Sequence, residues 1–162
     1  MVKRFYTTIN PLYYTQLIMI QIKTITAKET YPVRLAVLRK NIPLPFEFTG
    51  DFDEDTFHLG AFLDNQLVAV ASFMKVSNHL FSGLQYQLRG MATLEKFQGA
   101  GAGKVIMQHA FKKLIDLKIN CLWCNARVVA VPFYKKLGMN VVGKPFDIEF
   151  IGVHNTMVKV LS

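Results

Sequence analysis

A short glycine-rich stretch, Gln98-Gly99-Ala100-Gly101-Ala102-Gly103, has the composition of an anion-binding loop. It lies between a strand-like segment, 84–94, and a helix-like segment, 104–117. Because glycine and alanine carry little side chain, consecutive N–H groups can face an open concavity at a helix N-terminus. The first amides there lack partners and the dipole is positive, which suits phosphate-type anions. The alternative is a glycine-rich helix start that binds nothing.

Two common nucleotide-binding loops do not fit this stretch. A P-loop requires glycine at the position of Gln98 and serine or threonine at the position of Val105. A dinucleotide-binding fingerprint requires G-x-G-x-x-G and an acidic residue about twenty positions later, where this chain has Asn120 and Cys121. The glycines here alternate instead, so both interpretations fail on residue type.

The two cysteines, Cys121 and Cys124, are spaced C-x-x-C. A redox pair of this spacing belongs at a helix N-terminus, where the thiolate is stabilised. This pair lies in a buried strand-like segment, where alternation sends the two side chains to opposite faces. We therefore expect buried structural thiols and no metal site.

Length and composition predict one globular domain. The chain has 162 residues, of which 51% are hydrophobic and 19% are charged. No apolar run approaches the ~20 residues that span a bilayer. The apolar segment 12–22 follows Lys3 and Arg4, but no small-residue cleavage site follows it. We expect a cytoplasmic protein that does not bind a membrane.

The net charge is +8, from 19 lysines and arginines against 11 acidic residues. Nucleic-acid binding is one interpretation of such a balance, and it would make affinity steeply salt-dependent. The charges are scattered, and the longest basic runs are pairs. Because a polyanionic cofactor or an acidic substrate would use the same field, we expect no nucleic-acid partner.

The element pattern predicts an α/β layered domain over 19–162, preceded by a poorly ordered extension, 1–18. Helix 26–41 would present Leu35, Ala36 and Leu38 to the core, and helix 104–117 would present a stripe that includes Leu117. Gly90, inside a strand, predicts a bulge or a close approach by a ligand. The predicted strands and helices, in chain order, are 20–25, helix 26–41, 57–63, 66–76, 84–94, helix 104–117, 119–125, helix 130–137, 139–143 and 156–161. The central strand–helix–strand portion must be a right-handed parallel unit.

Three stretches together resemble the GNAT acetyltransferase superfamily. The first is Gln98-x-x-Gly101-x-Gly103, which is similar to its acyl-CoA pyrophosphate loop. The second is Asn125 at a strand end followed by Phe133-Tyr134-Lys135-Lys136-Leu137-Gly138-Met139, where the family has Phe at the last position. The third is Leu88-Arg89-Gly90-Met91-Ala92-Thr93 together with Ile151-Gly152-Val153-His154, where a small bacterial branch has Gly-Pro-His before the last strand. The resemblance covers about residues 19–161.

The resemblance implies a mixed, mainly antiparallel sheet flanked by helices, with a central β-α-β unit. It implies acetyl transfer from acetyl-CoA to a primary amine, by direct attack in a ternary complex. The residues it assigns to the cofactor are Met91, Ala92, Thr93, Gln98, Gly99, Ala100, Gly101, Ala102, Gly103, Asn125 and Phe133. Amides of 98–103 would hold the pyrophosphate, and the backbone of 91–93 would pair with the pantetheine arm and hold the developing oxyanion.

The same resemblance makes Tyr134 the general acid that protonates the departing thiolate. His154 is the first choice for the general base because of its motif position, and Glu54 and Glu149 are further candidates. Each assignment has a structural alternative: Tyr134 as a core tyrosine, Asn125 as a helix cap and His154 as a structural histidine.

The acceptor is not identified by the sequence. A small-molecule or amino-acid-like amine is the expectation, and a catalytically silent acyl-CoA-binding module is the alternative. The acidic segment 47–55, in the long loop 43–56, is either a solvated connection or a wall of the substrate pocket that favours a cationic acceptor. The oligomeric state stays open, and a homodimer is compatible with the sequence.

Overall fold

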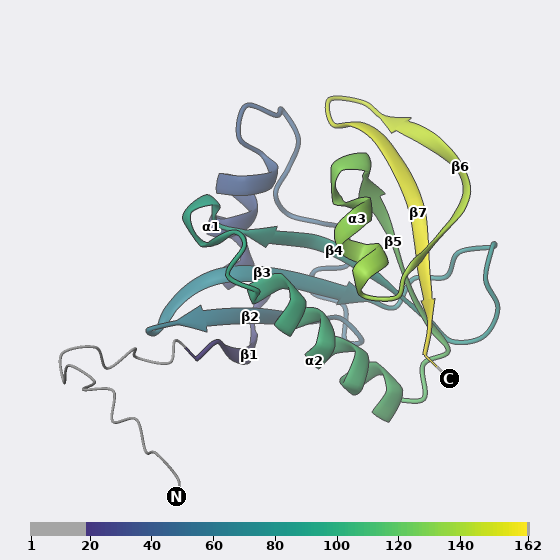
Figure 1. The fold of residues 1–162 in the computed structure, drawn as a ribbon, viewed down its shortest axis with the longest axis horizontal. Helices are drawn as coiled ribbons and strands as arrows, with labels where there is room; N and C mark the ends of the chain where they lie inside the picture. Colours follow the sequence, from purple (N-terminus) through teal and green to yellow (C-terminus); the bar gives the residue numbers. More distant parts are fainter. Residues whose placement is uncertain (1–18, 162) are drawn as a thin grey trace, which may run out of the picture.

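Within residues 19–161, which the computed structural model describes, seven strands form one sheet in the order β1-β2-β3-β4-β5-β7-β6 (Figure 1). The predicted extension 1–18 lies outside the described residues. The strands are β1 (Gln21–Ile25), β2 (Phe57–Leu63), β3 (Gln66–Met74), β4 (Gln85–Thr93), β5 (Cys121–Arg127), β6 (Asn140–Ile148) and β7 (Gly152–Val160). The helices are α1 (Ala27–Leu38), α2 (Ala102–Asp116) and α3 (Val131–Lys136), with 3₁₀ turns η1 (Glu95–Phe97) and η2 (Val128–Ala130).

The sheet is mixed, as predicted. Neighbouring strands pair antiparallel except β4 and β5, which are parallel and are joined through α2. The predicted order of strands and helices is confirmed. The mainly antiparallel α/β architecture therefore matches the expectation from the sequence.

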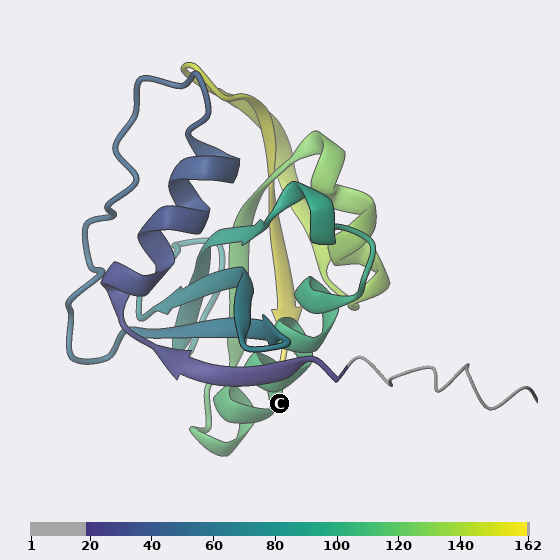
Figure 2. The ribbon, with the colours of Figure 1, turned by 90° about the vertical axis from the view of Figure 1, so that its left-hand side faces the viewer.

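The helices cover both faces of the sheet. Val70 of β3 packs in one apolar cluster with Val33 of α1, whereas its neighbours Ala69 and Ala71 pack in the cluster that includes Ile106 of α2. Since successive strand residues point to opposite faces, α1 and α2 lie on opposite sides of the sheet. Figure 2 shows this division, with α3 on the side of α2.

Several local signals act as the sequence predicts. Asp64 and Asn65 both have positive φ, as the two-residue hairpin between β2 and β3 requires. Thr26 and Glu29 form a reciprocal capping box at the start of α1. Gly138, at φ +82°, ends the segment of α3.

The predicted core face of α1 is wrong at two of its three positions, and only Leu38 packs, half-buried, against a core cluster. Leu35 is 51% exposed and Ala36 is exposed, while Ala27, Thr30, Val33 and Arg34 are buried. The buried face contains an arginine, so apolar residue types did not mark it. The helix also ends at Leu38 instead of 41. On α2, the predicted stripe holds except that Leu117, just past the helix end, is 50% exposed.

The last two strands are longer than predicted. β6 and β7 form a hairpin over 140–160 in place of strands at 139–143 and 156–161. The register shifts between Val142 and Phe146, so the polar stretch between them bulges out of the ladder and weakens the strand pattern in the sequence. His154 consequently lies inside β7, not before it.

Candidate active site

The two parallel strands separate halfway along their length. β4 pairs with β5 from Gln85↔Cys121 to Leu88↔Cys124, and no pairing continues beyond this point. β5 goes on pairing with β7, and the end of β4 goes on pairing with β3. Residues 89–93 of β4 therefore present a free backbone edge to the gap, which can take up an extended ligand as an extra strand.

A bulge in β4 lies at this free edge. Arg89 pairs with Ser72 and Ala92 with Val70, so Gly90 and Met91 together oppose one residue of β3. Gly90 has φ +62°, and a Cβ there would lie 2.8 Å from the Phe48 ring. The predicted bulge is confirmed, and the close approach at Gly90 is made by a protein side chain.

A cavity of about 590 Å³, here called the loop cavity, lies beside this edge. It is lined by residues of β4, the glycine-rich loop, the start of α2 and the segment of α3. These are Val37, Met91, Ala92, Thr93, Phe97, Gln98, Gly99, Gly101, Ala102, Gly103, Lys104, Val129, Ala130, Phe133 and Tyr134. The structure thus brings together the residues that the sequence assigns to the cofactor, apart from Ala100 and Asn125.

The glycine-rich loop presents amides without protein partners. Gly101 is the N-cap of α2 at φ +90°, and no side chain caps the helix. Within residues 19–161, the N–H groups of Gly99, Gly101 and 102–104 donate to no protein acceptor. A Cβ at Gly99 or Gly101 would meet nothing within 4 Å, so these glycines leave open space. The Gln98 amide donates to the Thr93 carbonyl at 3.2 Å, which ties the loop to β4.

A second cavity of about 290 Å³, here called the arginine cavity, adjoins the loop cavity and shares Tyr134 with it. It is lined by Leu38, Arg39, Phe48, Gln87, Leu88, Arg89, Gly90, Met91, Cys124, Asn125, Ala126, Arg127, Ala130, Tyr134, Ile148, Ile151 and His154. Met91, Ala130 and Tyr134 line both cavities. The two cavities therefore meet at the tyrosine that the sequence assigns as an acid.

Tyr134 is 6% exposed and packs edge-on against Phe133, with ring centroids 5.1 Å apart. Burial, and after it the proximity of Cys124, raises the pKa of Tyr134 above its ordinary value. Burial also raises the pKa of Cys124 to about 12. Both groups stay protonated at neutral pH, so the tyrosine can act as a proton donor and the cysteine remains a structural thiol.

His154 is 4% exposed and lines the arginine cavity. Its Nδ1 lies 2.6 Å from the Gly152 carbonyl oxygen, which can only accept a hydrogen bond. Nδ1 therefore carries the proton in the neutral ring, and Nε2 keeps a lone pair. This tautomer suits a proton acceptor.

Asn125 also belongs to the arginine cavity, at the point where β5 leaves β4. Its side-chain oxygen accepts a hydrogen bond from the Thr156 hydroxyl at 3.1 Å, which orients the amide. It does not cap the following helix, since the N-cap positions are Arg127 for η2 and Ala130 for α3. Glu54 and Glu149 are exposed and line neither cavity.

The acidic loop does not supply negative charge to either cavity. Of residues 43–56, only Phe48 lines one, and none of the loop's carboxylates does. The structure thus favours the solvated connection over an acidic pocket wall, and the cationic acceptor stays a prediction without support from these cavities. The physical reason is that one carboxylate, Asp51, is neutralised inside the protein and the others face solvent.

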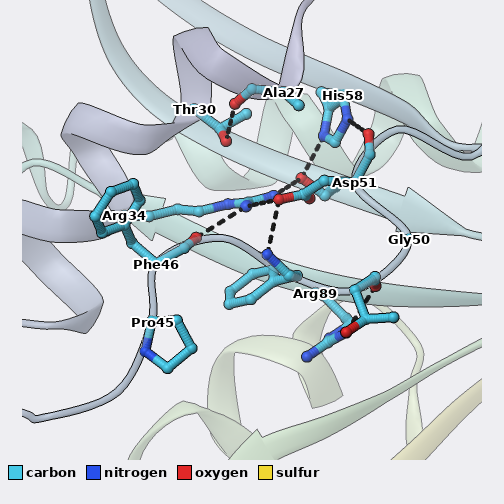
Figure 3. Close-up of polar contacts among 12 residues, drawn as sticks. Ala27, Thr30, Arg34, Pro45, Phe46, Gly50, Asp51, His58 and Arg89 are labelled. Carbon is cyan, nitrogen blue, oxygen red and sulfur yellow. Dashed lines mark hydrogen bonds and ion pairs between the residues drawn. The ribbon is translucent and has the colours of Figure 1, made fainter.

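Asp51 forms a buried ion pair with Arg34 (Figure 3). Both guanidinium nitrogens of the Arg34 fork donate to the Asp51 carboxylate, at 2.7 and 2.8 Å, and Arg34 also donates to Ser72 Oγ and the Phe46 carbonyl. Burial by itself raises the pKa of Asp51, but the hydrogen bonds from Arg34 and the Phe48 amide outweigh it and lower the pKa. The pair fixes the loop against the sheet.

Three arginines of the second cavity were not assigned a role from the sequence. They are Arg39 after α1, Arg89 on β4 and Arg127 at the end of β5. The available signal was an arginine in the middle of one strand, Arg89 of β4, and another at the end of the next strand, Arg127 of β5. No group of three or more His, Cys, Asp or Glu side chains in the described chain could hold a metal ion. Among the described helices, none is long and apolar enough to cross a membrane.

Comparison with known proteins identifies the family. The model of the acetyltransferase (GNAT) family matches residues 21–139. The chain belongs to the GNAT acetyltransferase family. The uncharacterized N-acetyltransferase YitI of Bacillus subtilis (strain 168) is 40% identical over 145 residues, which are 88% of this chain and 97% of YitI. This GNAT protein is accordingly an acetyltransferase, as its sequence motifs indicate.

Solved structures share the fold of this GNAT protein. ElaA from Escherichia coli has a TM-score of 0.73 at 19% identity, covering 87% of this chain and 99% of ElaA. An acyl-CoA N-acyltransferase from Pseudomonas aeruginosa has a TM-score of 0.71 at 21% identity, covering 88% of this chain and 99% of that enzyme. At these identities the likeness concerns the fold alone.

Proposed function

We propose that this protein transfers the acetyl group of acetyl-CoA to the primary amine of a small-molecule or amino-acid-like acceptor. The amine would attack directly while both substrates are bound. The observation that carries the proposal is the meeting of the loop cavity and the arginine cavity at Tyr134. Substrates that enter from the two sides would have their reacting ends beside one proton donor.

The residues of the loop cavity fit acetyl-CoA. The partnerless amides of Gly99, Gly101 and 102–104 suit the pyrophosphate, and the free edge of β4 suits the amide-bearing pantetheine arm. Lys104 adds a positive charge to the rim. Acetyl-CoA supplies a thioester whose sulfur leaves as the acetyl group is transferred.

The proposed proton transfers use two side chains. His154 Nε2 would accept the proton that the ammonium group must lose before it can attack. The Tyr134 hydroxyl, kept protonated by burial, would donate to the departing sulfur. Asn125, oriented by Thr156, would hydrogen-bond the cofactor arm between them.

The test is Tyr134→Phe with Tyr86→Phe as a matched control. Tyr86 is equally buried, at 5% exposed, but it lines neither cavity and its hydroxyl donates to the Asp55 carbonyl. Removing one proton donor should lower kcat by about 10²- to 10⁴-fold in an amine-dependent thiol-release assay. Acetyl-CoA affinity should stay within about twofold, because the hydroxyl acts only in the chemical step.

Three outcomes oppose the proposal. Equal activity of Tyr134→Phe and wild type would remove the tyrosine from the chemistry. An equal loss of activity in Tyr134→Phe and in the control would attribute the defect to folding and not to a missing proton donor. Binding of acetyl-CoA without thiol release for any amine would leave a silent acyl-CoA-binding module.

A further inference from the structure

We propose that the acceptor carries an anionic group, a carboxylate or a phosphate, which Arg39, Arg89 and Arg127 bind in the arginine cavity while the amine is held beside Tyr134 and His154. This inference rests on the proposed acetyl transfer and names the chemical class of its acceptor. It replaces the cationic acceptor that the acidic loop predicts.

The first support is the charge of the cavity wall. Its lining includes three arginines and no aspartate or glutamate. Within residues 19–161, the ion pairs are Arg34–Asp51 and Lys75–Asp55, so none of the three arginines is neutralised by a carboxylate. Figure 3 shows the Arg89 guanidinium lying apart from the Arg34–Asp51 pair. A concave wall with one sign of charge attracts ligands of the opposite sign.

The second support is that these arginines are close enough to repel one another. Burial lowers the pKa of Arg39, and the charges of Arg127, Arg89 and Arg34 lower it further. Burial and the charge of Arg34 likewise lower the pKa of Arg89, against the opposing effect of Asp51. A bound anion would relieve this repulsion, so the unliganded site is preorganised for an anion at a cost to the fold.

The third support is the number of unused donors. In the described chain, Arg127 donates no hydrogen bond to the protein, and Arg89 makes only long contacts, to the Thr49 carbonyl at 3.4 Å and to Met74 Sδ at 4.0 Å. Arg39 donates hydrogen bonds to backbone carbonyls from Nε and from one terminal nitrogen, so its other terminal nitrogen is available to a ligand. Planar guanidinium forks match carboxylate and phosphate oxygens in pairs.

The position of the arginines fits the chemistry. Arg127 of β5 pairs directly with His154 of β7, and residues opposite each other in an antiparallel pair share a face. An anion bound to Arg127 would therefore lie close to His154, the proposed base. The Phe48 ring holds Arg89 in place at the wall of the cavity. Its centroid lies 4.5 Å from Arg89 Cζ and 4.1 Å from Arg34 Cζ. The volume of about 290 Å³ suits a small acceptor.

These arginines do not serve the cofactor phosphates in this arrangement. The loop cavity has its own anion site in the amides at the start of α2, and none of the three arginines lines it. Two separate anion sites, in two cavities that share Tyr134, are what a phosphate-bearing donor and an anionic acceptor require.

The experiment compares matched primary amines by thiol release and by calorimetric binding in the presence of CoA. The panel holds amino acids, their carboxamides, aminoalkyl phosphates, neutral aminoalkyl alcohols and diamines. We expect kcat/KM for carboxylate- or phosphate-bearing amines to exceed that of the matched neutral amines by about 10- to 100-fold, the range of charge-assisted hydrogen bonds. Comparing the carboxylate-bearing with the phosphate-bearing amines shows which of the two anionic groups the cavity binds. Raising the ionic strength should reduce this preference.

The variant Arg127→Gln should reduce the preference for anionic amines by about tenfold or more. It should not lower the melting temperature, because the Arg127 side chain makes no hydrogen bond or ion pair within residues 19–161. Lys144→Gln is the matched control, since it removes the same charge from an exposed position on β6 outside both cavities. Its preference should equal that of wild type.

The failures of the two proposals are distinguishable. Loss of acetyl-CoA binding, or no thiol release with any amine, contradicts the proposed acetyl transfer. Acetyl-CoA binding with turnover of neutral amines or diamines at equal or better kcat/KM than anionic ones overturns the anionic acceptor. An unchanged preference in Arg127→Gln, or no calorimetric binding of any anionic amine, overturns it as well.

Discussion

Replacing Gly101 with glutamate should abolish acetyl-CoA binding while leaving the protein folded. Gly101 has φ +90°, and a left-handed conformation costs a residue with a side chain about 1–2 kcal/mol. A Cβ at this position meets nothing within 4 Å, so no packing penalty is added. A carboxylate at a helix N-terminus returns about 0.3–1 kcal/mol. The net cost to folding is therefore about 0–2 kcal/mol.

The effect of Gly101→Glu on acetyl-CoA binding is larger than its effect on folding, because the carboxylate that stabilises the helix N-terminus repels the cofactor. The new carboxylate would occupy the concavity formed by the partnerless amides and repel the pyrophosphate. Acetyl-CoA at a hundred times its dissociation constant should stabilise wild type by about 2.7 kcal/mol. In a domain of this size each kcal/mol moves the melting temperature by about 2–4 °C, so wild type should gain about 5–11 °C. Gly101→Glu should gain none.

The matched control is Gly143→Glu. Gly143 has φ +77°, a Cβ there also meets nothing within 4 Å, and its position on β6 lies outside both cavities. This variant carries the same strain and charge but should keep the full acetyl-CoA shift. ATP and NAD, tested in parallel, should not reproduce the shift of acetyl-CoA and CoA. A normal shift in Gly101→Glu, or an equal loss in both variants, would refute the assignment of the loop.

His154→Gln should lower kcat/KM for the amine by about 10²- to 10⁴-fold near neutral pH. The loss should be smaller at high pH, because more of the amine is then already neutral in solution. The control His109→Gln, at an exposed site on α2, should behave as wild type in the same assay. Asp51→Ala should lower the free energy of unfolding in urea by about 3–5 kcal/mol, because it leaves the buried Arg34 guanidinium without its counter-charge. The control Asp53→Ala, at an exposed position, should change the free energy of unfolding by no more than about 0.5 kcal/mol. Burial lowers the pKa of His58 in the folded state, so the unfolded state binds more protons and stability should fall as pH drops below about 6.5. The lowered pKa of Asp51 extends this loss below about pH 4. A flat stability profile between about pH 7 and 4 would contradict the His58 effect, and a flat profile below about pH 4 would contradict the Asp51 effect.

Local signals in the sequence predicted most of the fold and the glycine-rich loop, which the proposed function assigns to the cofactor. The glycines of the loop act through backbone conformation and open space, which depend on their own residue type. The Thr26–Glu29 capping box and the Asp64-Asn65 hairpin are equally local. Strand pairing follows chain order from β1 to β5, whereas β7 lies between β5 and β6.

The acceptor side could not be predicted in this way, because it depends on contacts between distant segments. Arg34 meets Asp51 17 positions away and Ser72 38 positions away, and no periodic pattern encodes either contact. Buried arginines are rare unless paired, so an apolar-stripe argument assigned Leu35 to the core instead. The same pairing neutralises Asp51 inside the protein, so the net charge of the acidic loop does not describe the lining of either cavity.

The bulge at Gly90 connects the two sides of the site. A Cβ at this position would lie 2.8 Å from Phe48 and 3.0 Å from Arg34 Nε, so only glycine lets the α1 arginine and the loop phenylalanine approach β4. The same bulge adds the extra residue, Met91, at the point where β4 leaves β5 and the free edge begins. Phe48 in turn separates Arg34 from Arg89 and directs the latter to the arginine cavity. This one bulge therefore lies at both proposed sites, beside the edge proposed for the cofactor and the arginine proposed for the acceptor. A side chain at position 90 should impair the binding of acetyl-CoA and of the acceptor together.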